Sequence, residues 1–290
     1  MNYSGLRAFH YVVEKGTITR AAATLGVTQP TLSGHIKELQ AQYGVALLER
    51  VGRRVRPTDV GQALFEFSRR YFSVENEMDA YLTSARDPAT GRLRIAADAP
   101  SHVVSAMAAF SRRFPRIHLT VSLGNSNDIL AQLLDRRCDI AIAAGLPRDR
   151  RLFTLPLREH KLVALVPRQH PWASRERVRL IELAFQAVIL REPGSRTREV
   201  LQRALERIGV ALIDELEIGG REGVIEAVAA GLGVGVTFDS EYRPNERLTA
   251  VRFTGAPTKS REYIACLASR RSTPAVDAFM RIATELARRG

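Results

Sequence analysis

Residues 17 to 39, TITRAAATLGVTQPTLSGHIKEL, predict two short helices joined by a tight turn. Either Thr17 or Thr19 is placed to cap the first helix, and Gly26 supplies a residue able to turn the chain where that helix ends. Thr28 is placed to cap the second helix. Apolar residues at helical spacing give each helix one inward face, made of Ala21, Ala22 and Leu25 and of Leu32, Ile36 and Leu39. We therefore predict a helix-turn-helix, preceded by a helix over residues 3 to 15.

The second helix of such a unit lies in the DNA major groove, so the side chains near its start are those able to meet base edges. The residues predicted to contact DNA from this helix are Thr28, Gln29, Pro30, Thr31, Ser33, His35 and Lys37. The predicted partner is double-stranded DNA. An ordinary helical hairpin without a nucleic-acid partner is the alternative.

A basic turn follows the second helix. Residues 46 to 58, ALLERVGRRVRPT, alternate apolar side chains around Gly52-Arg53-Arg54 and predict a small hairpin, or wing. The predicted contacts to phosphates or to the adjacent minor groove come from Arg50, Arg53, Arg54, Arg56 and Thr58. The alternative is an exposed basic turn with no partner.

A long helix without proline is predicted for residues 58 to 86. Its apolar residues follow one another at spacings of four and three, as in a coiled-coil seam. The predicted seam is Val60, Leu64, Phe67, Tyr71, Val74, Met78 and Tyr81. We predict a dimer, which would present two recognition helices to two half-sites. A monomeric helix packed on its own core is the alternative.

Beyond a short hinge at residues 87 to 91, strand-like and helix-like segments alternate to the end of the chain. RLRIAADAP, residues 92 to 100, predicts a strand and its exit loop, and a helix is predicted to start at Ser101. The same alternation recurs through residues 161 to 289. We predict an α/β body of two lobes with a cleft between them, with a single larger sheet as the competitor.

Composition sets further limits on the 290-residue chain. Lys plus Arg number 43 and Asp plus Glu 31, giving a net charge of +12. A polyanionic partner fits this charge, and arginine used only for solubility would explain part of it. Cys138 and Cys266 stand alone, and the six histidines are scattered without metal-ligand spacing, so no disulfide framework, metal or other cofactor is expected. Because neither a secretory leader nor a membrane span is evident, we expect a cytoplasmic protein.

The glycines of the chain do not predict a catalytic or nucleotide site. The glycines of residues 231 to 235 follow a helix and lead into a strand, the reverse of a dinucleotide-binding loop. Ser195 has no G-x-S-x-G around it, and no His and acid pair stands at a catalytic spacing. We therefore do not expect an enzyme.

Residues 21 to 64 resemble the winged helix-turn-helix signature of LysR-type transcriptional regulators. The resemblance rests on the paired alanines, the T-Q-P opening, Leu-Glu-Arg before the wing and Thr-Asp-x-Gly at the long helix. LVALVPRQHP, REPGSRTR and EAVAAGLGVG are similar to hallmarks of that family's effector domain. Gln40, Leu48 and Gly220 depart from the usual residues, and Gly220 removes one hydroxyl from the expected cleft.

The resemblance implies three parts. They are a DNA-binding domain at 1–58, a linker dimerisation helix and hinge at 59–90, and an effector domain at 91–290. The effector domain would be a periplasmic-binding-protein-like pair of Rossmann-like lobes, with lobe I at 91–161 and 267–290 and lobe II at 162–266.

The resemblance also implies that helix openings face the cleft, where unpaired N–H groups and the helix dipole favour anions. The predicted effector-binding residues are Asp98, Ser101, His102, Asn125, Ser126, Asn127, Gly194, Ser195, Arg196, Thr197 and Glu222. Each opening could instead be a cap that serves its own helix. Asp98 could meet an ammonium group, in which case a zwitterion would satisfy the whole cleft, or it could cap the next helix.

The segments ADAP, GNSNDIL, PGSRTRE and GREGVIEAVAAGLGVG are similar to those of a LysR subgroup associated with aminoethylphosphonate catabolism. Sulfate-like, carboxylate and aromatic acid effectors stay open. The predicted function is an effector-responsive, sequence-specific transcription factor, a dimer or dimer of dimers that would also meet RNA polymerase. The alternatives are a cytoplasmic solute-binding protein or enzyme, and an architectural protein whose DNA affinity is set only by salt.

Overall fold

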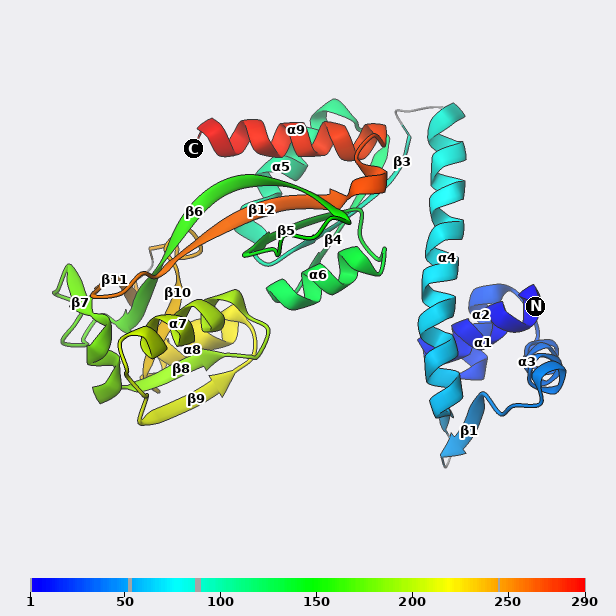
Figure 1. The fold of residues 1–290 in the computed structure, drawn as a ribbon, viewed down its shortest axis with the longest axis horizontal. Helices are drawn as coiled ribbons and strands as arrows, with labels where there is room; N and C mark the ends of the chain where they lie inside the picture. The colour runs from blue at the N-terminus through cyan, green and yellow to red at the C-terminus, as the bar shows by residue number, and fades with distance from the viewer. Residues whose placement is uncertain (1, 52–53, 87–89, 245, 290) are drawn as a thin grey trace. The chain divides into compact units, whose positions relative to one another are not determined.

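The computed structural model describes residues 2–51, 54–86, 90–244 and 246–289 (Figure 1). The chain divides into two compact units, Met1–Asp79 and Ala80–Gly290. None of the helices described has the length and apolar composition that crossing a membrane requires.

The first unit contains the predicted helix-turn-helix. Its elements are α1 (Tyr3–Lys15), α2 (Ile18–Leu25), α3 (Gln29–Tyr43), β1 (Leu48–Val51), β2 (Arg54–Pro57) and the start of α4 (Asp59–Arg86). Thr17, not Thr19, caps α2 by accepting from the N–H of Arg20 at 3.3 Å. Thr28 caps α3 as predicted, accepting from the N–H of Thr31 at 3.3 Å. The wing is also confirmed, since β1 and β2 pair antiparallel.

The wing and the start of α4 are held by local polar contacts. The side-chain carbonyl of Gln40 accepts from the N–H of Leu47 at 2.7 Å, which fixes the entry to the wing. Thr58 accepts from the N–H of Gly61 at 3.0 Å and donates to the carbonyl of Ala46 at 2.8 Å. Gly61 lies so close to the carbonyl group of Leu47 that an added β-carbon would collide with it. Only glycine fits this corner without movement.

Helix α4 has two different faces. Phe72 is buried, and Ser68 is buried where its hydroxyl lies 2.8 Å from Nδ1 of His10 in α1. Another face keeps large apolar side chains in solvent, with Phe67 62% and Met78 56% exposed. The exposed members of the predicted seam are Val60, Phe67, Tyr71, Val74 and Met78. Of the remaining members, Leu64 packs against the core of the unit, and the side chain of Tyr81 lies outside the described residues.

The second unit is the predicted α/β body. Its first half consists of β3 (Gly91–Ala97), α5 (Pro100–Arg113), β4 (Ile117–Leu123), α6 (Ser126–Leu134), β5 (Ile140–Ala144) and β6 (Leu152–Pro167). There follow β7 (Arg177–Arg179), η1 (Leu180–Phe185), β8 (Ala187–Arg191), α7 (Arg196–Arg207), β9 (Asp214–Ile218) and α8 (Arg221–Ala229). The unit ends with β10 (Val234–Phe238), β11 (Leu248–Thr254), β12 (Lys259–Leu267), η2 (Ala268–Arg270) and α9 (Pro274–Arg289).

Two lobes are present, and paired strands run between them (Figure 1). One core gathers around Phe110 and Phe279, and another around Trp172 and Phe238. The hydrogen-bonded order is β4-β3-β5-β12-β6-β10-β8-β9, so β6 and β12 join the lobes into one ladder. The prediction of two lobes is confirmed by the two separate cores. The alternative, a single larger sheet, also holds in one respect, because the strands of both lobes form one continuous hydrogen-bonded ladder.

Several predicted boundaries were wrong by small amounts. Helix α5 starts at Pro100 with Ala99 as its N-cap, not at Ser101. Strand β6 extends far upstream of the predicted LVALVP segment, because Pro156 and the charged residues after it are typical of a loop in sequence alone. Strands β7 and β11 were not predicted. The glycines at 231–235 do form a helix-to-strand return, between α8 and β10.

Candidate functional site

The start of α3 presents most of the predicted DNA-reading side chains to solvent. Those that are exposed are Thr28, Gln29, Pro30, Thr31 and Lys37, and those half-buried are Ser33 and His35. In the wing Arg56 is exposed, Arg53 lies outside the described residues, and nothing is described of the side chains of Arg50 and Arg54. Thr58 uses its hydroxyl as an internal cap of α4, so its role is at least partly structural.

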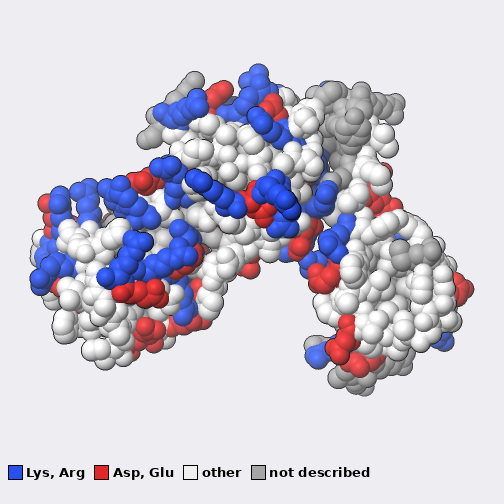
Figure 2. Space-filling view, viewed as in Figure 1, with Lys and Arg blue, Asp and Glu red and all other residues white. Residues whose placement is uncertain are grey.

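Positive charge is not confined to the DNA-binding unit. On the face drawn in Figure 2, Lys and Arg side chains lie beside Asp and Glu side chains over the second unit. Arg175 pairs with Glu182 at 2.8 Å, and Arg247 pairs with Glu226 at 2.6 Å. Part of the arginine excess is therefore neutralised within the fold, as the solubility interpretation of the composition allows.

A small pocket lies where the two lobes of the second unit meet. Side chains from both lobes line it, at the ends of β3, β4, β8 and β10 and at the starts of α6, α7 and α8. The lining residues are Asp98, Gly124, Asn125, Ser126, Arg191, Ser195, Arg196, Thr197, Arg221, Phe238 and Glu241. We call this the effector pocket. Its free volume of about 10 Å³ is about enough for one water, so a larger ligand requires the lining to move.

The lobes touch directly beside the effector pocket. The backbone N–H of Asn127 in lobe I donates to the carbonyl of Gly194 in lobe II at 3.3 Å. The guanidinium of Arg196 donates to the hydroxyl of Ser260 at 3.1 Å and packs across Gly145 of lobe I. Glycine at positions 145 and 194 therefore lets the lobes approach closely.

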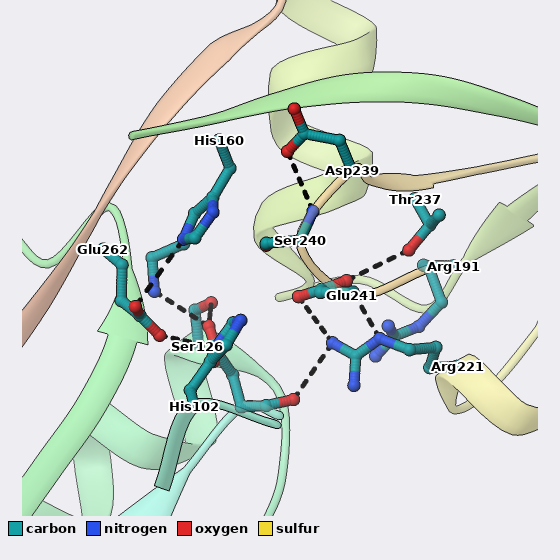
Figure 3. A network of polar contacts seen from close by, with 12 residues as sticks. His102, Ser126, His160, Arg191, Arg221, Thr237, Asp239, Ser240, Glu241 and Glu262 are labelled. Carbon is teal, nitrogen blue, oxygen red and sulfur yellow. Dashed lines mark hydrogen bonds and ion pairs between the residues drawn. The ribbon is translucent and has the colours of Figure 1, made fainter. Parts of the chain in front are cut away.

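Each arginine of the pocket already has a carboxylate partner. Arg221 contacts Glu241 at 2.7 Å and donates to the backbone carbonyl of Asp98 at 3.1 Å (Figure 3). Arg191 forms two 2.8 Å hydrogen bonds to Glu192, and Arg196 pairs with a glutamate of its own helix. Burial raises the pKa of Glu192, but the Arg191 guanidinium and backbone N–H groups outweigh burial and hold that pKa to about 2. An entering anion must compete with these carboxylates for the arginines.

Asp98 is engaged inside lobe I. Its carboxylate accepts from the N–H of Ala144 at 2.8 Å, lies 3.2 Å from Nδ1 of His102 and accepts from the hydroxyl of Ser126 at 3.4 Å. Burial raises the pKa of Asp98, but His102 and the Ala144 N–H outweigh burial and leave it below its usual value. The carboxylate is therefore charged, and its charge is met from within the lobe.

Behind the pocket lies a buried cluster of His102, His160 and Glu262 (Figure 3). Nδ1 of His102 is 2.5 Å from Oε1 of Glu262, and the two imidazole rings stack with centroids 5.3 Å apart. Burial lowers the pKa of His102, but Asp98 and Glu262 together raise it to about 9. Burial lowers the pKa of His160. At neutral pH His102 is therefore an imidazolium and His160 is neutral.

Comparison with known proteins decides what this architecture is. Residues 3–62 match the family described as bacterial regulatory helix-turn-helix protein, lysR family, and residues 86–288 match the LysR substrate binding domain. The chain belongs to the LysR family. It is a DNA-binding transcriptional regulator with an effector-binding domain.

The relatives are regulators of similar length. The chain is 29% identical to the RuBisCO operon transcriptional regulator of Allochromatium vinosum, covering 94% of this chain and 92% of that protein. It is 30% identical to the regulator CbbR of Xanthobacter flavus, covering 95% and 85%. The fold matches the crystal structure of CbnR with a TM-score of 0.75, at 20% identity and 99% coverage of both chains. The regulatory domain of Synechocystis CcmR in complex with 2-PG is 26% identical, covers 68% of this chain and 98% of that chain, and has a TM-score of 0.62.

The predicted effector residues of this LysR regulator divide into three groups. Asp98, Asn125, Ser126, Ser195, Arg196 and Thr197 line the pocket. Asn127 and Gly194 lie at the lobe contact and line a neighbouring groove. Outside the described pocket lining, Ser101 is half-buried, His102 belongs to the buried cluster, and Glu222 is exposed on α8.

The helix caps at the pocket also differ from one another. Asn125 accepts from the N–H of Asp128 at 3.0 Å and so caps its own helix. Ser195 is buried at the start of α7, but its side chain makes no capping hydrogen bond to the residues described. The Ser195 hydroxyl is therefore not committed to capping α7.

Sequence reasoning missed Arg191, Arg221 and Glu241. Arg191 ends β8, Arg221 starts α8 and Glu241 follows β10, so their positions at strand ends and helix starts could have identified them. It also missed the histidine cluster, because 58 residues separate His102 from His160 and a further 102 separate His160 from Glu262.

Proposed function

We propose that this LysR regulator binds a small anion in the effector pocket and that the anion controls sequence-specific DNA binding by a dimer. The observation that carries the proposal is the convergence of three arginines, Arg191, Arg196 and Arg221, with the starts of α6 and α7. Guanidinium groups and helix N-termini are the usual ligands of small anions in proteins. The CcmR regulatory domain, a relative in fold and sequence, has been solved in complex with 2-PG.

An anion in the pocket would change the contacts between the lobes. Arg221 of lobe II meets both Glu241 of its own lobe and the carbonyl of Asp98 in lobe I. A ligand that binds this guanidinium would weaken its contact with Asp98 or Glu241 and replace it with a contact to the ligand. It would thereby favour a different angle between the lobes. The effector needs only to bind one arrangement better than the other to shift the population.

A more specific form of the proposal is that the anion is a phosphonate such as 2-aminoethylphosphonate. Its anionic half suits the arginines. Its ammonium half would need a carboxylate, and Asp98 already meets the Ala144 N–H and the His102 imidazolium. We therefore infer that the pocket recognises the anionic group, and that an amine adds little to the affinity.

The exposed seam on α4 supports the dimer. A row of large apolar side chains in solvent is unfavourable, and a second copy of the same helix would cover it. Two recognition helices would then meet two half-sites with two-fold related sequences. RNA polymerase remains a predicted partner of such a regulator.

Thermal unfolding of the purified chain against a panel of acids tests the effector proposal. The panel contains 2-PG, 2-aminoethylphosphonate, phosphate, sulfate and aromatic carboxylates. A ligand at a hundredfold excess over its Kd stabilises the fold by about 2.7 kcal/mol. Ser195→Ala should reduce the shift in melting point given by the best anion, whereas Ser174→Ala, an exposed control, should leave it unchanged. A panel without any stabilising anion, or equal shifts in both variants, would overturn the pocket assignment.

DNA binding is tested with operator and random duplexes at one salt concentration. Gln29→Ala should weaken operator binding by about 1 to 3 kcal/mol and leave random DNA little changed. Arg53→Ala and Arg56→Ala should weaken both equally, because phosphate contacts carry no sequence information. Equal losses on the two duplexes for Gln29→Ala would reject its base-reading role.

A further inference from the structure

The buried cluster of His102, His160 and Glu262 lies where the lobes are joined. His160 is on β6, opposite Ser260 of β12, and the pairing of these strands shifts register around Glu262. A bulge of this kind re-aims a side chain, and here the Glu262 side chain is fully buried beside both rings. His102 comes from α5 of lobe I. The cluster thus ties one helix to both connecting strands.

The cluster concentrates buried polar atoms that lack hydrogen bonds. Among the described residues, these atoms include Nε2 of His102, both ring nitrogens of His160 and Oε2 of Glu262, whereas Oε1 of Glu262 lies 2.5 Å from Nδ1 of His102. Oε2 of Glu262 is 3.7 Å from Nε2 of His160 and 3.3 Å from Nε of Arg158, but these contacts are not directed as hydrogen bonds. Each unsatisfied buried group is costly, and so many in three side chains call for a shared ligand.

The donor atoms identify the kind of ligand. Two imidazoles and one carboxylate are a donor set of zinc and the neighbouring first-row divalent ions. One donor atom of each residue lies within 4.8 Å of those of the other two. Since zinc bonds to nitrogen and oxygen are about 2.0 to 2.2 Å long, the more distant donors would need to close in, whereas Nδ1 of His102 and Oε1 of Glu262, which are 2.5 Å apart, would need to separate to admit the ion. The rings are within 8° of parallel, so one ring must also turn about its Cβ–Cγ bond to aim at a common centre.

We propose that His102, His160 and Glu262 form a binding site for a divalent first-row transition ion, with zinc as the reference metal. Oδ1 of Asp98, 3.2 Å from Nδ1 of His102, is a further oxygen that could take a fourth position. Nε of Arg158, whose side chain is 42% exposed, lies 3.3 Å from Oε2 of Glu262, so the ion would compete with this guanidinium for the carboxylate.

The proposed ion would restrain the joint between the lobes. It would bind α5, β6 and β12 at one point, behind the effector pocket and separate from the arginines that meet the anion. The three principal ligands are not among the residues that line the pocket, and Asp98, the candidate for the fourth position, belongs to both sites. The metal site adds a second small ligand, of opposite charge, that would act on the same lobe angle.

The test uses the full-length chain after chelator treatment and dialysis. Calorimetric titration with Zn²⁺ should show one ion per chain, and Co²⁺ should give the strong visible absorption of a four- or five-coordinate site. Mg²⁺, which prefers oxygen ligands in an octahedron, should not bind. Absence of Zn²⁺ binding by the wild-type chain, or equal binding of Mg²⁺, would overturn the proposal whatever the variants do.

Variants locate the site. Glu262→Gln and His160→Gln should weaken Zn²⁺ binding by more than the roughly 10- to 100-fold that loss of an outer-shell partner costs. His118→Gln, an exposed histidine of β4, is the matched control and should bind Zn²⁺ as the wild type does. The circular dichroism of each metal-free variant shows that it is folded. Unchanged Zn²⁺ affinity in folded Glu262→Gln and His160→Gln chains would mean that the ion binds elsewhere, and the cluster would then hold only a proton.

Discussion

Replacing Gly61 with alanine should destabilise the DNA-binding unit, although alanine normally strengthens a helix. The new β-carbon would lie 3.0 Å from the carbonyl carbon of Leu47, closer still to its oxygen, and 3.2 Å from Cβ of Pro57. Backbone on one side and a proline on the other leave little room to yield. Overpacking of this kind costs about 1 to 3 kcal/mol, and the helix gain of about 1 kcal/mol offsets only part of it. Because the clash is with backbone, the cost should lie at the upper end of that range, and we expect a net loss of about 2 kcal/mol.

Gly34→Ala is the matched control. Gly34 lies within α3, and a β-carbon there would meet no described atom within 4 Å. This substitution should stabilise by about 1 kcal/mol, so the two variants differ in sign. Calorimetry of the full chain is the suitable measurement for the DNA-binding unit. The fluorescence of the single tryptophan, Trp172, would report on the second unit instead, because Trp172 is buried in a core there. A Gly61→Ala chain as stable as Gly34→Ala would show that the corner between the wing and α4 is not tightly packed.

Two further outcomes follow from contacts described above. Phe67→Glu, on the exposed seam of α4, should shift the sedimenting species from dimer to monomer, whereas Gln62→Glu on the same helix should not; an unchanged dimer in both would place the interface elsewhere. The pKa of Glu192 is lowered to about 2 from 4.5, so its ion pair with Arg191 contributes stability that is present above pH 4.5 and lost as the pH falls towards 2. Glu192→Gln should therefore cost about 1 to 3 kcal/mol at pH 7 and progressively less below pH 4.5 in denaturant titrations, and a cost that does not change with pH would contradict this.

The features predicted correctly from the sequence are those specified by neighbouring residues. The helix-turn-helix follows from Thr17, Gly26 and Thr28, which cap or end helices through contacts within three or four positions. The wing and α4 could be predicted in the same way, because a turn and a regular spacing of apolar residues are local properties of the chain. The lobes were visible as alternating strands and helices.

The polar interior of the second unit depends on contacts that sequence spacing does not encode. Arg221 meets the carbonyl of Asp98 across 123 residues, and the cluster of His102, His160 and Glu262 joins three segments that are also far apart in the chain. The prediction that Asp98 could meet an ammonium group rested on its position at the end of a strand. The sequence does not reveal that the fold brings the N–H of Ala144 and the ring of His102 to the same carboxylate.

The paired strands β6 and β12 give the joint between the lobes a definite mechanical character. A joint made of single loops would allow the lobes many angles at little cost. Twisting a hydrogen-bonded ribbon has an elastic cost that grows with the angle, so each lobe arrangement should have a narrow spread. A ligand that displaces the lobes then works against a restoring force and produces one defined displacement. In this way a pocket with room for little more than a water can impose a definite geometry on a much larger domain.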